Sequence, residues 1–287
     1  MAILTPAQQE QFSDDGFIIL DGFYSDEEMS DFSSEVKQII HAYLHKAAVD
    51  TDGAVAPEAY TDENILDDGL LALEEVDHEY VAAVYDTIAY CTAFLRLAGK
   101  KETQALVNQL LDNQPNTPLY GFTNRCRIDP PRDDRRTYGW HQEVFYTIPK
   151  SRFLQTWAPL IRDTTYENGT IEVCVGSHQA GISKQDWTEK EGCATQIIVD
   201  EEVVNQYEQK VVEMTVGQIL VFTGKTVHRS GSNTSDQVRY SLVGMYHDIQ
   251  WNDFLAPKPD FTFRRIQARQ YYQSVASAWQ EGAIAGE

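Results

Sequence analysis

An imidazole and a carboxylate stand two residues apart in the segment HQEVFY, where His141 and Glu143 flank Gln142. On a β-strand successive side chains alternate between the two faces, so we expect His141 and Glu143 to project to the same side. Both are common metal ligands. A polar strand end with a salt-bridged carboxylate would have the same pattern, so a further ligand is needed to decide between the two interpretations.

That further ligand is His228, which follows the apolar run Ile219 to Phe222 and precedes the turn-forming cluster GSNTSD. The run predicts a buried strand with His228 at its polar end. Arg239 and Ser241 begin the next strand, and a hairpin would bring them to the same end of one sheet as His228. Two imidazoles and one carboxylate match the facial triad of non-haem Fe(II) oxygenases, which leaves coordination positions open.

Arg239 has the chemistry to hold an organic acid beside this metal. Its planar guanidinium can make two parallel, charge-assisted hydrogen bonds to a carboxylate. The hydroxyl of Ser241, two residues on and on the same strand face, can add a third.

The elements that must position these residues lie mainly in the second half of the chain. Short β-rich runs follow one another there, among them LYGFTNRCRI, HQEVFYTI, RFLQTWAPL, TIEVCV and QVRYSLVGMYHDI. Turn signals such as DPPRDD and ENGT separate them at short intervals. This pattern is typical of an all-β sandwich or barrel and not of alternating β and α units.

The first part of the chain is predicted to be mostly helical. Thr5 and Pro6 signal a helix start, residues 17–20 form a short apolar strand, and Ser25 with Glu28 makes a capping box for a helix that reaches about His45. Further helical patterns and a long acidic loop follow: helices over 72–98 and 102–112, and the loop over 49–68.

We therefore expect one domain over residues 1–287, because no linker rich in Gly or Ser interrupts the chain. Its predicted parts are a mostly helical N-terminal part (1–115), a β core (116–250) and a C-terminal helical segment (251–287).

Composition narrows the function classes. The net charge of −21 disfavours binding to a nucleic-acid backbone, which needs clustered Lys and Arg. No uncharged apolar run reaches the roughly 18 residues of a membrane span, and the N-terminus lacks a signal-peptide pattern. The four cysteines have no zinc-site or disulfide spacing. These features predict a cytoplasmic protein whose partner is a small molecule.

Basic residues gather near the proposed metal site, between Arg125 and Arg152, in an otherwise acidic chain. One interpretation is a substrate that carries a carboxylate, phosphate or sulfate group, because positive groups beside a cleft often meet an anion. The other is that these arginines pair with nearby acids, including those of the 49–68 loop.

The motifs together resemble the phytanoyl-CoA dioxygenase-type branch of the Fe(II)- and 2-oxoglutarate-dependent oxygenases. The resemblance runs from FSDDGFIILDGFYSDEE through WHQEVFY and ENGTIEVCVGSHQAG to VHRSGSNTSDQVRYS, and so covers most of the chain. It implies a double-stranded β-helix (jelly roll, cupin-like) with flanking helices.

The resemblance also implies the cofactors and their ligands. His141, Glu143 and His228 would bind Fe(II), and Arg239 with Ser241 would hold the distal carboxylate of 2-oxoglutarate. O2 would be the oxidant, with succinate and CO2 released. Three further residues are interpreted as co-substrate or pocket contacts, with a salt bridge or core packing as the alternatives: Arg127, Thr156 and Trp157.

Glu143 departs from this family pattern, in which the carboxylate is usually Asp. Both acids ligate iron, and a carboxylate at this position favours hydroxylation or desaturation over the chlorination that goes with Ala or Gly there. The sequence leaves two other functional interpretations open. The jelly roll could bind a metal and a ligand without turnover, as a sensor or carrier, or it could catalyse a different metal reaction such as isomerisation.

Overall fold

The computed structural model describes residues 3–189, 196–258 and 273. Its compact units are Met1–Phe254 and Leu255–Glu287. All the strands and helices described below belong to the first unit. Most of the predicted C-terminal helical segment lies outside the described residues.

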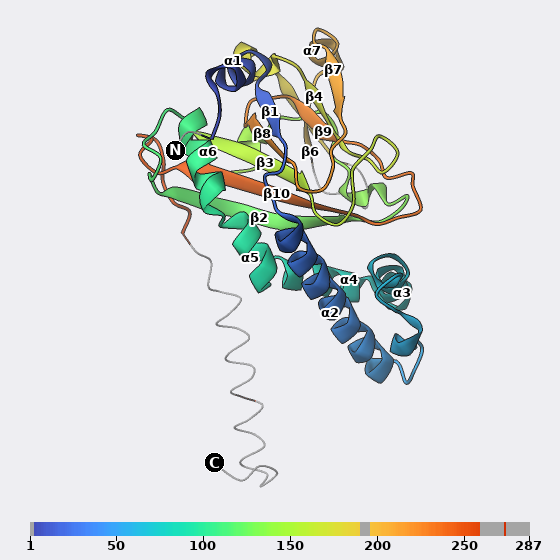
Figure 1. Ribbon diagram of the computed structural model, residues 1–287. Helices are drawn as coiled ribbons and strands as arrows, with labels where there is room; N and C mark the ends of the chain where they lie inside the picture. The colour runs from blue at the N-terminus through green and yellow to red at the C-terminus, as the bar shows by residue number, and fades with distance from the viewer. Residues whose placement is uncertain (1–2, 190–195, 259–272, 274–287) are drawn as a thin grey trace. The chain divides into compact units, whose positions relative to one another are not determined.

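A five-stranded antiparallel sheet forms the centre of the first unit, with strand order β1-β8-β3-β10-β2 (Figure 1). Its longest strands, β2 and β10, pair along almost their whole length, and a bulge interrupts the register between Val243 and Met245. The strands are β1 Phe17–Leu20, β2 Leu119–Asp129, β3 Phe153–Pro159, β8 Ile219–Thr223 and β10 Arg239–Asp248.

A second, three-stranded antiparallel sheet has the order β7-β4-β9. A separate two-stranded hairpin pairs β5 with β6. The strands are β4 Ile171–Cys174, β5 Gln185–Thr188, β6 Gln196–Val199, β7 Gln209–Val212 and β9 His228–Ser230.

Helices precede and cover the larger sheet. Figure 1 shows α2 to α5 on one side of that sheet, and β4, β7 and β9 on the other. The side chain of Ser25 caps α2, and the side chain of Glu28 accepts a hydrogen bond from the backbone amide of Ser25, as the capping box predicts. The longer helices are α1 Pro6–Asp15, α2 Asp26–Asp50, α3 Leu70–Val76, α4 His78–Ile88, α5 Thr92–Ala98 and α6 Lys101–Leu110.

Two apolar cores follow from the alternation of side chains along the strands. On one face, Leu154 and Ala158 of β3 pack with the helices, in a core that includes Phe32 of α2. On the other face, Trp157 of β3 packs against Ile171 of the smaller sheet. The predicted β-sandwich with outer helices is confirmed, and the space between the two sheets is where a site can be built.

The structure corrects several local predictions. HQEVFYTI is not a strand: His141 makes only an isolated bridge, and Glu143 opens a short 3-10 helix, Glu143–Phe145. The pattern over 72–98 is divided among α3, α4 and α5, because Asp77 is extended and caps α4, and Cys91 is extended just before α5. The 49–68 region contains the end of α2 and two short helices, Pro57–Ala59 and Ile65–Gly69.

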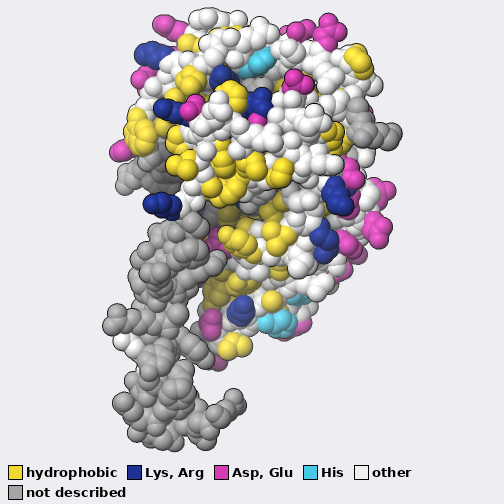
Figure 2. Space-filling model, turned by 90° about the vertical axis from the view of Figure 1, so that its left-hand side faces the viewer, with side chains coloured by type: hydrophobic (Ala, Val, Ile, Leu, Met, Phe, Trp, Pro, Cys, Tyr) yellow, Lys and Arg dark blue, Asp and Glu magenta, His cyan; other side chains and the backbone are white. Residues whose placement is uncertain are grey.

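The surface shows how the chain carries its net charge of −21. On the face in Figure 2, hydrophobic side chains gather across the middle, and Asp and Glu side chains are dispersed around them.

No single helix among the described residues is long and apolar enough to cross a membrane. The bent pair His78–Ile88 and Thr92–Leu110 meets the length and composition only when its two parts are taken together.

His247, in β10, is fully buried and predicts a pH-dependent stability. Its Nε2 lies 2.9 Å from the hydroxyl of Thr147, and its Nδ1 lies 2.7 Å from that of Ser151. Burial lowers the pKa of His247 from 6.5 to about 4. Between these values the unfolded chain binds more protons than the folded one, so stability is lost as the pH falls from about 6.5 to about 4.

We expect this histidine alone to lower the free energy of unfolding by about 3 kcal/mol between neutral pH and pH 4. Chemical denaturation of the unmodified protein and of His247→Gln, at several pH values, measures the effect. The variant should show a smaller pH slope; equal slopes would contradict the prediction.

Candidate metal centre

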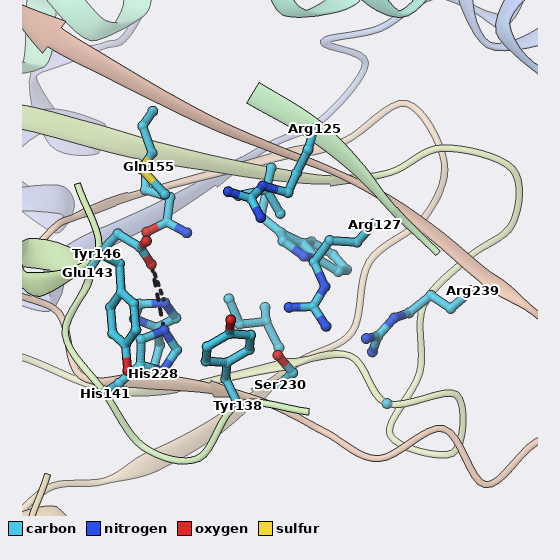
Figure 3. A pocket seen from close by; sticks show the side chains of 15 residues that line it. Arg125, Arg127, Tyr138, His141, Glu143, Tyr146, Gln155, His228, Ser230 and Arg239 are labelled. Carbon is cyan, nitrogen blue, oxygen red and sulfur yellow. Dashed lines mark ion pairs between the residues drawn. The ribbon is translucent and has the colours of Figure 1, made fainter. Parts of the chain in front are cut away.

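Two histidines and a glutamate meet between the sheets although they come from different elements (Figure 3). His141 and His228 face each other across a backbone bridge, in which each amide donates to the other residue's carbonyl at 2.9 and 3.0 Å. Glu143 is turned toward them by the short helix that it begins. All three side chains are buried.

The ligand atoms converge on one point. Glu143 Oε2 lies 3.6 Å from His141 Nε2 and 3.7 Å from His228 Nε2. One ligand atom from each side chain lies within 4.8 Å of the others. This spacing suits three ligands on one face of a single ion.

Backbone carbonyls fix the tautomer of both histidines. Nδ1 of His141 lies 2.8 Å from the carbonyl of Gly139, and Nδ1 of His228 lies 2.9 Å from the carbonyl of Thr226. A carbonyl only accepts, so each Nδ1 carries the proton and each Nε2 presents its lone pair to the centre. Metal-binding histidines are oriented in this way by their outer partners.

The local electrostatics keep His228 and Glu143 in their metal-binding forms. Burial, followed by the neighbouring His141, lowers the pKa of His228 from 6.5 to about 3, so its imidazole stays neutral. Burial alone would raise the pKa of Glu143, but the contact with His141 and nearby positive charges leave that pKa below its ordinary value. Two imidazoles beside a carboxylate form a good donor set for a divalent cation.

The ligands open onto a cavity of about 150 Å³ whose opposite wall carries arginines. Figure 3 shows Arg125, Arg127 and Arg239 across this space from the histidines. The strand register explains the arrangement, because Arg239 of β10 pairs with Asp129 of β2, and Ser241 pairs with Arg127. The lining also includes Tyr138, Tyr146, Gln155, Trp157, Gly169, Ile171, Ser230, Val243 and Met245.

Arg239 is buried and only partly satisfied. Its Nη2 lies 2.9 Å from Asp129 Oδ2, and its Nη1 donates to the carbonyl of Asn168 at 3.3 Å. Its Nε and the hydroxyl of Ser241 have no hydrogen-bond partner in the described structure. Buried donors without partners are costly, and two of them beside a cavity fit a bound acceptor such as a carboxylate.

The match of this sequence to a family model identifies the protein family of the chain. The model of the family "Phytanoyl-CoA dioxygenase (PhyH)" matches residues 12–241, which include all three metal-ligand candidates and Arg239. This chain belongs to the phytanoyl-CoA dioxygenase family.

Curated relatives extend the match over nearly the whole chain. The phytanoyl-CoA dioxygenase domain-containing protein 1 of Bos taurus is 22% identical, over 92% of this chain and 98% of its own length. An ectoine dioxygenase of Bordetella bronchiseptica is also 22% identical, over 95% of this chain and 85% of its own length.

Solved structures show the same jelly-roll fold. EctD from S. alaskensis with bound Fe superposes with a TM-score of 0.59 at 17% identity, covering 90% of this chain and 82% of EctD. A second EctD structure, with 2-oxoglutarate and 5-hydroxyectoine, has a TM-score of 0.53 at 19% identity, over 86% and 77% of the two chains. The epimerase SnoN, with Fe3+ and alpha ketoglutarate, gives 0.56 at 18%, over 84% and 82%.

The sequence-predicted site residues of this family member are placed as follows. His141, Glu143 and His228 come together, and Arg127, Trp157 and Arg239 line the same cavity. Ser241 lies between Arg239 and Val243 on the cavity-facing side of β10, although it is not part of the lining itself. Thr156 is not part of this lining: Gln155 and Trp157 face the cavity, so strand alternation turns Thr156 to the helix side, where its hydroxyl approaches the carbonyl of Gly244. This placement corresponds to the core-packing alternative.

Sequence reasoning also missed Asp129 and the space around Arg239. Asp129 accepts from Arg127 at 2.7 Å as well as from Arg239. Burial would raise the pKa of Asp129, but the two guanidinium groups hold that pKa well below its usual range. Gly169, at φ +80°, lies so close that an added Cβ would meet the backbone of Gly231 and approach Arg239 Nη1 to 2.9 Å. The strand alternation of Arg127 and Asp129 is the one signal that could have pointed to the acid.

Proposed function

We propose that this family member is an Fe(II)- and 2-oxoglutarate-dependent dioxygenase that hydroxylates an unactivated C–H bond of a small, anionic metabolite. The observation that carries the proposal is the coincidence of two sets of groups in one cavity. A buried triad of two imidazoles and a carboxylate lies on one wall, and Arg239 lies on the other. The Nε of Arg239 and the hydroxyl of Ser241, which lies two residues on along the same strand, have no hydrogen-bond partner in the described structure. An iron centre that works with a chelating diacid needs both the metal ligands and a group that holds the far carboxylate of the diacid.

Each residue has a distinct task in this proposal. His141 Nε2, His228 Nε2 and the Glu143 carboxylate would hold the iron and leave positions open for the co-substrate. Iron with 2-oxoglutarate and O2 supplies the oxidising chemistry and releases succinate and CO2. Arg239 and Ser241 would bind the distal carboxylate, while Trp157 closes the wall beside it and keeps water out.

Arg127 and Asp129 would act on the co-substrate through Arg239. Asp129 accepts from both Arg127 and Arg239, so it fixes the direction in which the Arg239 guanidinium points. Because Glu143 fills the carboxylate position, we favour hydroxylation or desaturation over halogenation. We also place the enzyme in the cytoplasm.

The alternative is a jelly roll that binds metal and ligand without turnover. Incubation of the purified protein with Fe(II), 2-oxoglutarate and O2, across a panel of small anionic metabolites, decides between the two by succinate formation. We expect slow succinate release without substrate and a clear stimulation by the substrate. Binding of Fe(II) and 2-oxoglutarate without any succinate across the panel would favour the sensor or carrier.

A further inference from the structure

A second cavity adjoins the one at the metal ligands. It has a volume of about 300 Å³ and lies between β2 and α4. Arg125, Arg127 and Tyr138 line both cavities and therefore form the boundary between them. The remaining lining residues are Ala82, Tyr85, Asp86, Ile128 and Arg135.

The sizes of the two cavities assign their occupants. The inner one, at about 150 Å³, is comparable to a cavity that holds one benzene molecule. A chelated 2-oxoglutarate that reaches Arg239 would take most of that space. The part of the substrate that is not being oxidised must then lie in the outer cavity, beyond Arg125 and Tyr138.

The arginines that border these cavities differ in their pairing. Arg127 and Arg239 share Asp129. Arg135, on the outer wall, is paired with Asp133 and Glu74, each at 2.7 Å.

Arg125 has no carboxylate partner among the residues whose side chains the structure describes. Its Nε donates to the carbonyl of Thr123 at 3.2 Å, which satisfies one donor and neutralises no charge. Burial raises the pKa of the neighbouring Tyr85, so its phenol stays neutral and adds no counter-charge to Arg125. Figure 3 shows its guanidinium turned toward the space between Glu143 and Gln155.

The charges of the loaded site single out this arginine. A ferrous ion, a 2-oxoglutarate dianion and the Glu143 carboxylate together carry one negative charge. The cluster of Arg127, Asp129 and Arg239 carries one positive charge and balances it. Arg125 is left over at the boundary of the two cavities. Asp86 also lines the outer cavity but forms no ion pair with Arg125 in the described structure. A positive group beside a closed site favours an anion there.

We propose, on the basis of the function proposed above, that the substrate is a small monocarboxylic acid whose carboxylate binds Arg125 at the mouth of the outer cavity. A single guanidinium matches one carboxylate through two parallel hydrogen bonds. A phosphate dianion fits less well, because it would bring a second charge toward Asp86 in the same lining. The rings of Tyr85 and Tyr138 would flank the carbon chain.

The test uses the intact protein loaded anaerobically with Fe(II) and 2-oxoglutarate, whose visible charge-transfer band reports the chelate. Radiolabelled propionate is the probe, with binding measured by equilibrium dialysis while the band is recorded. We expect propionate to bind with the band retained, and propionamide or inorganic phosphate to compete at least tenfold more weakly than unlabelled propionate.

Matched variants identify the residue. Arg125→Gln should weaken propionate binding at least tenfold, Arg125→Lys should restore part of it, and Arg135→Gln should change it less than twofold because Arg135 is already paired. Undiminished binding in Arg125→Gln would overturn the proposal. Loss of the band on adding propionate would also overturn it, because the probe would then be displacing 2-oxoglutarate. A band that never forms in the unmodified protein would instead reject the proposed function itself.

Discussion

Replacing His228 with alanine is expected to abolish succinate formation and to weaken Fe(II) binding by at least a hundredfold. His228 supplies one of three converging ligand atoms, and its Nε2 lies 3.7 Å from the carboxylate of Glu143. Loss of an outer partner of a metal ligand typically costs about 10- to 100-fold in affinity, so loss of the ligand itself should cost at least the upper end of that range. Anaerobic competition with a chromophoric chelator measures the iron affinity, and succinate is assayed in parallel.

A matched control separates the metal from general damage. His78 is an exposed histidine near Asp77 and Glu79, so His78→Ala should leave iron affinity and turnover unchanged. Thermal unfolding of apo His228→Ala should still show one cooperative transition. Unchanged iron affinity in a folded His228→Ala protein would reject the ligand assignment, as would the same result for His141→Ala or Glu143→Ala.

The three side chains that meet at this centre could be predicted from the sequence, but the way they are brought together could not. The chain has 7 His and 44 Asp or Glu residues, so residue type alone does not select these three. The two-residue spacing of His141 and Glu143, with His228 and then Arg239 after a later strand, was enough to select them. The expected route, a strand with both side chains on one face, is wrong at Glu143, which begins a short helix. A strand and such a turn present the same pair, so the spacing alone does not distinguish them.

The predicted hairpin between His228 and Arg239 is wrong for a related reason. β9 belongs to the three-stranded sheet and β10 to the five-stranded one, so residues 231–238 cross from one sheet to the other. The turn signals GSNTSD mark a reversal of the chain but do not say which sheet the next strand joins. That choice depends on pairing with β2 and β3, which lie far away in the sequence.

The pairing of Asp129 with two arginines depends on the same distant contacts. The register that places Arg239 opposite Asp129 links residues from two separate strands, and a single sequence does not contain it. By contrast, the capping box at Ser25 and the buried strand that begins at Ile219 are local and were predicted correctly. The basic run was identified locally, yet which arginine lacks an acid became visible only with the side-chain geometry.

Replacing Arg239 with alanine is expected to raise the KM for 2-oxoglutarate on the order of a hundredfold while iron affinity stays within about twofold. A buried charge-assisted pair contributes about 2 to 5 kcal/mol when one partner is removed, and 1.4 kcal/mol corresponds to a factor of ten. Arg239 is not one of the three clustered metal-ligand candidates, so the variant should retain its iron affinity. Initial rates at varied 2-oxoglutarate, with parallel iron titrations, measure both quantities.

Two companion variants show whether Arg239 acts as a directed clamp or only as a positive charge. Arg239→Lys keeps the charge but loses the planar fork, so its KM should fall between those of the parent and Arg239→Ala. Asp129→Asn keeps the shape of the side chain but weakens its hold on the Arg239 Nη2, and should raise the KM about tenfold with kcat nearly unchanged. A KM in Arg239→Ala equal to that of the parent would contradict the clamp. If Asp129→Asn lowered kcat and left KM alone, the acid would act on the reaction and not on the direction of the guanidinium.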